Sequence, residues 1–371
     1  MIALGMIVML AGCQSVPTRS GKASTASKSD TIILPADGKH RVALLLPITG
    51  PDGDVGRSIA NATAMALIDT GNTKISVQTY DTALGVDAAA RRAMQDGSML
   101  ILGPLRSDNV IEVAGIARAR NVPIITFSND IGVAGRNVYL LGHLPNQSID
   151  RIVRYSKARG LNRFAAIVPR NVYGQRAASS VTSSVAGAGG ALVDIEEIDG
   201  SSASLNAAVQ KLKASGPVDA VIVADAGKSA IATVTALRSA GIKARILGTE
   251  LWNVDTLLPG SNMMQGAWFA SVPDGFFRQY ATKYRARYNK APLRISSLGY
   301  DSVLLVGKVM PNWKLGTTFP LGKLTDKDGF IGLDGAFRFS PSGLSDRTLE
   351  VQEVQRGQYV TVDAAPKVFG N

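Results

Sequence analysis

The sequence predicts an α/β protein with two doubly wound, Rossmann-like lobes joined by a hinge. Short apolar segments alternate with amphipathic stretches along most of the 371 residues, and a second series of such units begins after residues 139–142. Several of the short segments are apolar throughout, which is typical of parallel strands covered by helices on both faces. Strand–helix alternation over a chain of this length predicts two α/β lobes.

The N-terminus is predicted to carry an export signal. Residues 1–10 are almost entirely apolar, a run too short to cross a bilayer and typical of the core of a signal peptide. The motif LAGC at residues 10–13 follows and resembles the lipobox of bacterial lipoproteins. We expect a signal peptide over 1–12 and lipid attachment at Cys13, the single cysteine; the alternative is an ordinary buried thiol.

A tether is predicted to follow the anchor. Residues 13–39 are rich in Ser, Thr, Gly and Lys, a composition typical of flexible linkers. Gln14 stands where an Asp favours retention in the inner membrane in the best-known bacteria. We therefore expect the protein on the periplasmic face of the outer membrane, with the inner membrane as the alternative.

Each element of the folded body is predicted from its apolar pattern. Strands are expected at 41–46, 75–80, 99–102, 123–127, 164–168, 191–198, 220–224 and 245–247. Helices are expected at 58–69, 86–95, 108–120, 146–159, 174–186, 205–214 and 229–240. Residues 268–270 lead to two further helices at 276–288 and 296–309, and the C-terminal segments 336–339, 349–354 and 359–362 alternate like small strands.

These elements suggest one lobe interrupted by another. The first lobe is predicted to hold residues 40–143 plus 271–330, and the second residues 144–270 plus 331–371. Several chain crossings between the lobes make a hinged cleft.

Composition and motifs argue against an enzyme or a cofactor protein. One cysteine excludes an internal disulfide, and His40 and His143 are too few for a His-rich metal site. The chain contains no G-x-S-x-G or H-E-x-x-H motif, and its glycine-rich segments match neither a Walker loop nor G-x-G-x-x-G. We expect no catalysis, no metal and no cofactor.

The net charge of +11 is concentrated in a few segments. Residues 276–294 hold six Lys or Arg and no acid, and aromatic residues recur every four positions from Phe276 to Tyr288. This spacing predicts a helix that packs its rings inward and turns its cations to water. An exported protein with such a surface suits an anionic wall polymer, acidic lipid or acidic protein better than nucleic acid.

Ligands in open α/β sheets bind beyond the carboxyl ends of the strands. The corresponding loops here are 47–57, 81–85, 103–109, 127–132, 169–174, 225–229 and 248–254. Their hydroxyls and helix N-termini suit a small polar or anionic group. Plain helix capping, by Ser58, Ser107 and Asp108, is the alternative explanation.

An ordered series of motifs resembles a known family. These are VALLLPITGP, VGRSIANATAMAL, LILGPLRSDNV, NVPIITFSND, IVPRNVYGQRA, DAVIVADAG, ILGTELWN, SLGYDSVLL and GAFRFSPSG. Together they resemble the leucine/isoleucine/valine-binding branch of type I periplasmic binding proteins, and so imply that fold. GAWFASVPDGFF and FRFSPSGLSDRTLEVQEV resemble more closely the lipoproteins called penicillin-binding protein activators.

The resemblance implies an amino-acid site in the cleft. Ser107 matches the serine that holds the ligand carboxylate, Tyr173 matches the tyrosine of the second lobe, and Glu250 matches the acid that pairs with the ligand ammonium. The remaining cleft positions depart from the family.

The departures lie in two loops of the predicted cleft. Asn129 and Asp130 stand where the family has small residues and a threonine, and Asp130 would repel a ligand carboxylate. Ser128 and Asp225 are also expected among the ligand-binding residues of the cleft. The loop after Asp225 lacks the aromatic residue that the family often has there.

The resemblance favours an accessory protein for cell-wall synthesis. It would bind a class A penicillin-binding protein through its surface, with the cleft vestigial or holding an unknown small polar ligand. The alternative is the substrate-binding receptor of an ABC transporter, delivering branched-chain or other amino acids to a permease. A second alternative is a periplasmic small-molecule sensor.

Overall fold

In the computed structural model, which describes residues 37–254 and 257–369, the first apolar segments pair as parallel strands. They form a five-stranded sheet of order β2-β1-β3-β4-β5. Its strands are β1 (His40–Leu46), β2 (Ile75–Asp81), β3 (Leu100–Leu102), β4 (Ile124–Thr126) and β5 (Val138–Leu140), and the intervening helices are α1 (Gly53–Asp69), α2 (Val86–Gln95) and α3 (Ser107–Arg118). The predictions for the signal peptide and Cys13 fall outside the described residues.

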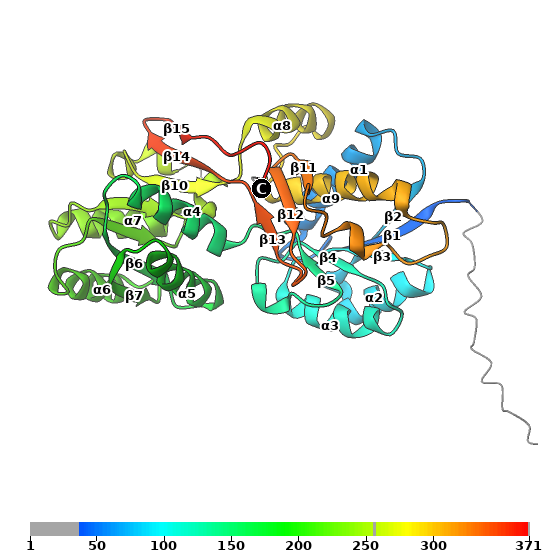
Figure 1. Ribbon diagram of the computed structural model, residues 1–371, viewed down its shortest axis with the longest axis horizontal. Helices are drawn as coiled ribbons and strands as arrows, with labels where there is room; N and C mark the ends of the chain where they lie inside the picture. Colours follow the sequence, from blue (N-terminus) through cyan, green and yellow to red (C-terminus); the bar gives the residue numbers. More distant parts are fainter. Residues whose placement is uncertain (1–36, 255–256, 370–371) are drawn as a thin grey trace, which may run out of the picture. The chain divides into compact units, whose positions relative to one another are not determined.

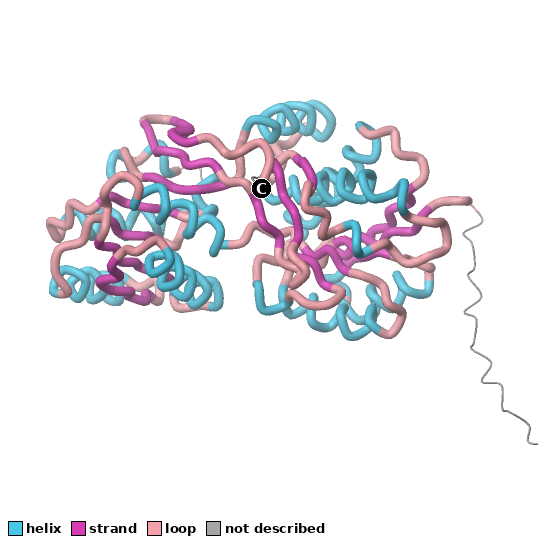
Figure 2. Tube along the Cα trace, viewed as in Figure 1, coloured by secondary structure: helices cyan, strands magenta, loops and turns pink. Residues whose placement is uncertain are grey.

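Strand β1 shows why these segments are apolar throughout. Val42, Leu44 and Leu46 point into one hydrophobic cluster with residues of α1, while Ala43 and Leu45 point into another with residues of α2 and α3. Successive side chains of a strand alternate between faces, so a sheet covered on both faces needs apolar residues at every position. Helices therefore flank the strands on both sides (Figure 2).

The second half of the chain builds a seven-stranded sheet of order β15-β14-β10-β9-β8-β6-β7. Its strands are β6 (Arg163–Pro169), β7 (Ala191–Ile198), β8 (Ala220–Val223), β9 (Arg245–Gly248), β10 (Trp268–Ser271), β14 (Glu350–Gln355) and β15 (Gln358–Asp363). The accompanying helices are α4 (Pro145–Lys157), α5 (Val172–Gly187), α6 (Ser202–Ala214) and α7 (Gly227–Ser239). These elements group together in Figure 1.

The last part of the chain is divided between the two lobes. A three-stranded sheet of β11 (Phe330–Gly332), β12 (Gly335–Phe339) and β13 (Ser345–Arg347) follows helices α8 (Gly275–Tyr288) and α9 (Ser297–Val309). Its rings Phe330, Phe337 and Phe339 belong to the same hydrophobic cluster as β1. Residues 331–347, which the sequence analysis assigned to the second lobe, thus pack with the first, because their aromatic face is buried there.

The chain crosses between the two groups of elements between β5 and α4, between β10 and α8, and between β13 and β14 (Figure 1). Parallel sheets covered by helices and linked by several crossings confirm the predicted α/β class with two doubly wound lobes.

Both lobes use a glycine to bring the helix that follows the first strand close to the end of that strand. A Cβ on Gly56 in α1 would lie 1.9 Å from the carbonyl oxygen of Pro47, and one on Gly174 in α5 would lie 1.7 Å from that of Pro169. Real Cβ atoms do not approach this closely, so these helices start against the strand ends only because no side chain intervenes.

We predict that Gly174→Ala destabilises the protein by about 1–3 kcal/mol, because the methyl group must push α5 away from Pro169. Gly187→Ala, at the exposed end of the same helix with no atom within 4 Å of the added Cβ, is the matched control and is expected to stabilise by up to about 1 kcal/mol. Urea denaturation of both variants measures the difference. Equal stabilities would contradict the packing argument.

Candidate functional site

Polar side chains gather at the carboxyl ends of the strands of the first sheet. Ser107 is the first residue of α3 and is half-buried, whereas Ser128, which follows β4, is buried. The Ser128 amide donates to Thr126 Oγ1 at 3.1 Å, and its hydroxyl accepts from the Asp130 amide at 3.2 Å. Ser128 is therefore engaged in shaping the turn after β4.

Asp130 is held by local and distant partners. Its carboxylate accepts from the Gly132 amide at 2.9 Å at the start of the 3-10 helix η2 (Ile131–Val133) and lies 3.2 Å from Arg176 Nη2 of α5. The pair links the two lobes, and the positive partner offsets the charge that was expected to repel a ligand carboxylate.

The corresponding end of the second sheet carries a hydrogen-bonded group around Glu250, the first residue of the 3-10 helix η3 (Glu250–Val254). Tyr173 Oη lies 3.0 Å from Glu250 Oε1 and 2.9 Å from Thr249 Oγ1, and the Glu250 amide donates to Ser148 Oγ at 2.9 Å. The hydroxyl of Tyr173 can donate only one proton, so it donates to Glu250 and accepts from Thr249.

Burial changes the acid–base properties of this pair. Desolvation raises the pKa of Glu250 to about 7, although the hydrogen bonds from Ser148 and Tyr173 oppose the shift. Desolvation and the nearby Glu250 carboxyl raise the pKa of Tyr173 well above its ordinary value, which keeps its proton in place. Glu250 Oε2 is buried and accepts no hydrogen bond from the described residues. Such an atom gains from a ligand that brings an N–H group.

Asp225 serves the local structure of its loop. Its carboxylate accepts hydrogen bonds from the Ala226 amide and from the Ser229 hydroxyl. Its backbone carbonyl accepts from Trp252 Nε1 at 2.7 Å. These bonds tie the loop after β8 to η3, which carries Glu250.

A pocket of about 360 Å³ lies between residues of the two lobes. Its polar lining is Asn129, His143, Glu250, Asn253, Ser271 and Arg294, and its apolar lining is Leu105, Phe127, Leu251, Val272, Ile295 and Leu298. Of the predicted cleft residues, the pocket thus brings together Asn129 and Glu250. The other predicted residues, Ser107, Ser128, Asp130, Tyr173 and Asp225, are not among those that line it.

Sequence reasoning missed the ionic network beside this pocket. Arg294, at the start of the 3-10 helix η6 (Arg294–Ser296), forms an ion pair with Asp334, which is fully buried between β11 and β12. Asp334 Oδ2 also lies 2.7 Å from His143 Nε2 and accepts from Ser297 Oγ at 2.7 Å. Arg294 is the last cation of the basic segment 276–294, whose cations were expected to face water, and it is buried instead.

Burial and the neighbouring charges together shift the pKa values of the ionisable residues around Asp334. Although burial alone would raise the pKa of Asp334, Arg294 and His143 hold it well below its usual range. Burial lowers the pKa of His143 despite the attraction of Asp334, and burial together with Asp334 raises the pKa of Asp301 to about 7. The fixed charges beside the pocket are therefore the Arg294 guanidinium and the Asp334 carboxylate.

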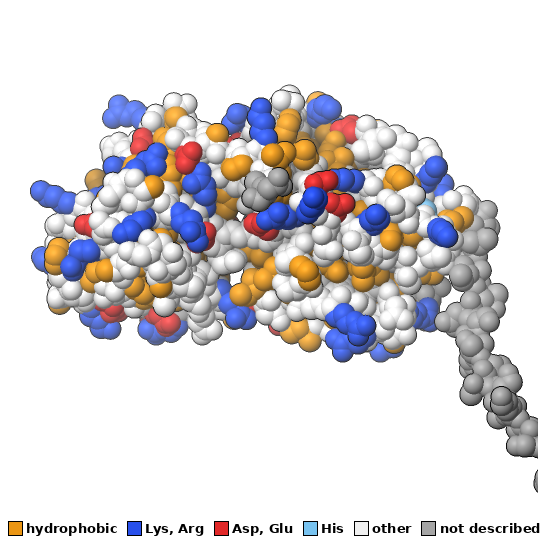
Figure 3. Space-filling view, in the orientation of Figure 1, with side chains coloured by type: hydrophobic (Ala, Val, Ile, Leu, Met, Phe, Trp, Pro, Cys, Tyr) orange, Lys and Arg blue, Asp and Glu red, His pale blue; other side chains and the backbone are white. Residues whose placement is uncertain are grey.

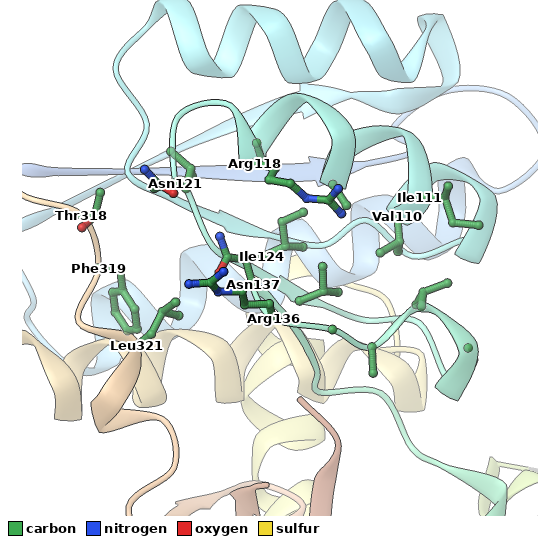
Figure 4. A pocket seen from close by; sticks show the side chains of 18 of the residues that line it. Val110, Ile111, Arg118, Asn121, Ile124, Arg136, Asn137, Thr318, Phe319 and Leu321 are labelled. Atoms are coloured by element: carbon green, nitrogen blue, oxygen red, sulfur yellow. The ribbon is translucent and has the colours of Figure 1, made fainter. Parts of the chain in front are cut away.

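A larger groove of about 700 Å³ lies away from this site, between α3, β5 and the segment 318–321. Figure 4 shows Arg118 of α3 and, just before β5, Arg136 and Asn137 around this groove, with Phe319 and Leu321 along it. None of the predicted cleft residues lines it.

Comparison with known proteins identifies the family. The sequence profile described as periplasmic binding protein matches residues 39–321. The chain belongs to the periplasmic binding protein family. As predicted, it is of the leucine-binding-like type I branch, and the lobes and the pocket between their residues fit that assignment.

Two curated relatives match the sequence. An uncharacterized protein of Rickettsia prowazekii (strain Madrid E) is 32% identical over 136 residues, 36% of either chain. The penicillin-binding protein activator LpoA of Mannheimia succiniciproducens is 24% identical over 355 residues, covering 87% of this chain and 55% of that protein. The chain thus aligns with about a third to about half of the length of these relatives.

Solved structures share the fold. A putative branched-chain amino acid ABC transporter protein from Rhodospirillum rubrum has a TM-score of 0.75 at 19% identity, with coverage of 87% of this chain and 100% of that chain. The periplasmic ligand-binding protein of a branched-chain amino acid ABC transporter from Burkholderia xenovorans has a TM-score of 0.74 at 16% identity, with coverage of 88% and 95%.

Across residues 37–254 and 257–369, no helix combines the length and the apolar character needed to span a bilayer. In the same ranges, no group of three or more His, Cys, Asp or Glu side chains is placed to hold a metal ion.

We predict that Glu250→Gln stabilises the protein more at pH 8 than at pH 5, by about 1–3 kcal/mol. Glu250 stays protonated in the folded state up to a pKa of about 7, whereas an unfolded glutamate loses its proton near pH 4.5. Between these two values the free energy of unfolding of the wild-type protein therefore falls as the pH rises. The variant with a neutral glutamine lacks this loss. Urea denaturation of both proteins at the two pH values isolates this group.

Exposed Glu112→Gln is the matched control. A stability difference for Glu250→Gln that is the same at pH 5 and pH 8 would show that burial does not hinder ionisation of Glu250.

Proposed function

We propose that this chain is a lipid-anchored accessory protein that stimulates peptidoglycan synthesis by binding a class A penicillin-binding protein. The observation that carries the proposal is the alignment with the activator LpoA, which extends over 87% of this chain. The similarity to the transport receptors is at 16–19% identity and concerns the fold alone. The protein acts in this proposal by binding, as its family does, and not by catalysis.

The positions of Asp130 and Ser107 in the cleft support a role other than amino-acid transport. Asp130 is paired with Arg176 at 3.2 Å, and Ser107 does not line the pocket, so two positions expected on the carboxylate side are used differently. An accessory protein that acts through its surface does not require those positions.

Helix α8 offers a basic surface for an acidic partner. Tyr280 and Tyr284 are buried against α1, as expected, whereas Phe276 is 55% exposed and does not join them. Lys and Arg side chains surround this helix in Figure 3. Arg278 and Arg285 are exposed and form no ion pair with the described residues, so they are free to meet carboxylates of a partner.

We predict that the double variant Arg278→Glu/Arg285→Glu binds the synthase at least about fivefold more weakly, because the reversed charges repel an acidic surface. Affinity is measured by surface plasmon resonance with the purified class A enzyme, and stimulation by glycan polymerisation and cross-linking rates. Lys213→Glu/Lys243→Glu, at exposed positions of the second lobe, is the matched control. If wild-type protein neither binds the synthase nor changes its rates, the proposed function is wrong.

A second candidate function is a receptor that delivers a small ligand to an ABC permease. The pocket favours it, because Glu250 Oε2 lies buried there without a hydrogen-bond donor from the described residues. Neighbouring folds include a solute-binding protein of Rhodopseudomonas palustris in complex with 3,4-dihydroxybenzoic acid, at 18% identity. Co-purification of a permease, and not of a synthase, with the native protein would decide for this candidate.

We propose that Cys13 carries the lipid anchor and places the body at the periplasmic face of the outer membrane. The prediction is that wild-type protein incorporates labelled palmitate and fractionates with membranes, whereas Cys13→Ser does neither. Matched Ser15→Ala, two residues away, is expected to behave as the wild type. Unchanged labelling of Cys13→Ser would contradict the anchor.

A further inference from the structure

The pocket between the lobes is lined by a buried arginine, Arg294, some of whose N–H groups have no hydrogen-bond acceptor among the described residues. Arg294 is 8% exposed and lines the pocket. Its Nη1 pairs with Asp334 and donates to Ser297 Oγ at 3.2 Å, and its Nε lies 3.5 Å from Asp274 Oδ1. Its Nε and Nη2 are both buried and have no hydrogen-bond partner among the described residues. A buried guanidinium N–H without an acceptor is costly, so the site favours an acceptor from outside the chain.

The guanidinium is held in place before any ligand arrives. Asp334 has no exposed surface and is itself held by His143 and Ser297, both at 2.7 Å. The Arg294 guanidinium carbon also lies 4.1 Å from the centre of the Phe277 ring, which packs against its face. A side chain fixed on several sides loses little entropy when an anion binds to its remaining N–H.

Free acceptors come from the second lobe. Glu250 Oε2 and Asn253 Oδ1 are buried without hydrogen-bond donors from the described residues, and both side chains line the same pocket as Arg294. The volume of about 360 Å³ is at the small end of the range for small-molecule sites, about 300–1,000 Å³. The six apolar residues of the lining can cover the hydrocarbon part of a ligand.

We propose that Arg294 is the anion-binding residue of this pocket, and that the ligand is a small molecule whose anionic group meets Arg294 and whose N–H or ammonium group meets Glu250. The first lobe thus supplies the cation through Arg294 in place of the hydroxyl expected at Ser107. Asp334 is a positioning residue, because it acts through Arg294. The proposal rests on the pocket being a ligand site, as in the second candidate function, and is independent of binding to a synthase.

The experiment uses the full-length protein and zwitterionic probes. Thermal shift is recorded with each of the common amino acids as L and D forms, and the strongest binder is then compared by calorimetry with its amide, which lacks the carboxylate. We expect the amide to bind at least about tenfold more weakly, because it cannot give Arg294 an anion. Absence of a shift with every probe would overturn this inference while leaving the synthase proposal standing.

Two substitutions distinguish the anion-binding residue. Arg294→Lys keeps the charge but removes the forked donor and is expected to weaken binding at least about tenfold, whereas Ser107→Ala is expected to change Kd by less than about twofold. Exposed Arg136→Lys is the control. The reverse pattern, with loss at Ser107 and none at Arg294, would overturn the proposal. If circular dichroism shows that Arg294→Lys does not fold, the Ser107→Ala result decides, since a tenfold loss there is incompatible with it.

Discussion

The buried carboxylate of Asp334 is the charge around which the chain crossings between the two lobes gather. It has no exposed surface and is matched by Arg294, His143 and Ser297. Each crossing between the lobes contributes a charged or ionisable residue near it: His143 before α4, Asp274 before α8, and Arg347 at the end of β13. Removing one partner from such a network leaves an unmatched buried charge, so the crossings are held in one arrangement.

The pocket inherits its chemistry from this network. Arg294 pairs with Asp334 through Nη1, which leaves Nη2 of this pocket-lining side chain without a partner among the described residues. On the second lobe, Glu250 Oε1 accepts from Tyr173 and the Glu250 amide donates to Ser148. Its other carboxyl oxygen, Oε2, has no hydrogen-bond donor among the described residues. Unpaired donors of Arg294 and unpaired acceptors of Glu250 and Asn253 therefore belong to residues that line one pocket, while Asp130 is occupied by Arg176. The charges beside the crossings thus also set the polar pattern that a ligand would meet.

Local patterns were sufficient for most elements. The helix predicted at 86–95 is α2, and the strand predicted at 41–46 is β1 with one more residue. The strand was predictable because a strand buried on both faces has consecutive apolar residues. The strand β5 was not among the predicted strands. The lobe of residues 331–347 was wrongly assigned, because strands with aromatic faces can pack on either lobe, and only contact with β1 and α9 decides.

The sequence by itself determined the α/β class, the family and the presence of Glu250 and Tyr173 at strand ends, since these follow from periodicity and from ordered motifs. The tertiary structure alone decided which polar atoms remain free. Ser107 and Asp130 stand in loops where a ligand would be expected, yet one lies outside the pocket and the other is paired with Arg176. Arg294 ends a basic segment whose cations were expected to face water, yet it is buried and lines the pocket, because Asp334, 40 positions later, holds it there. Such pairings depend on distances between lobes, which no local pattern encodes.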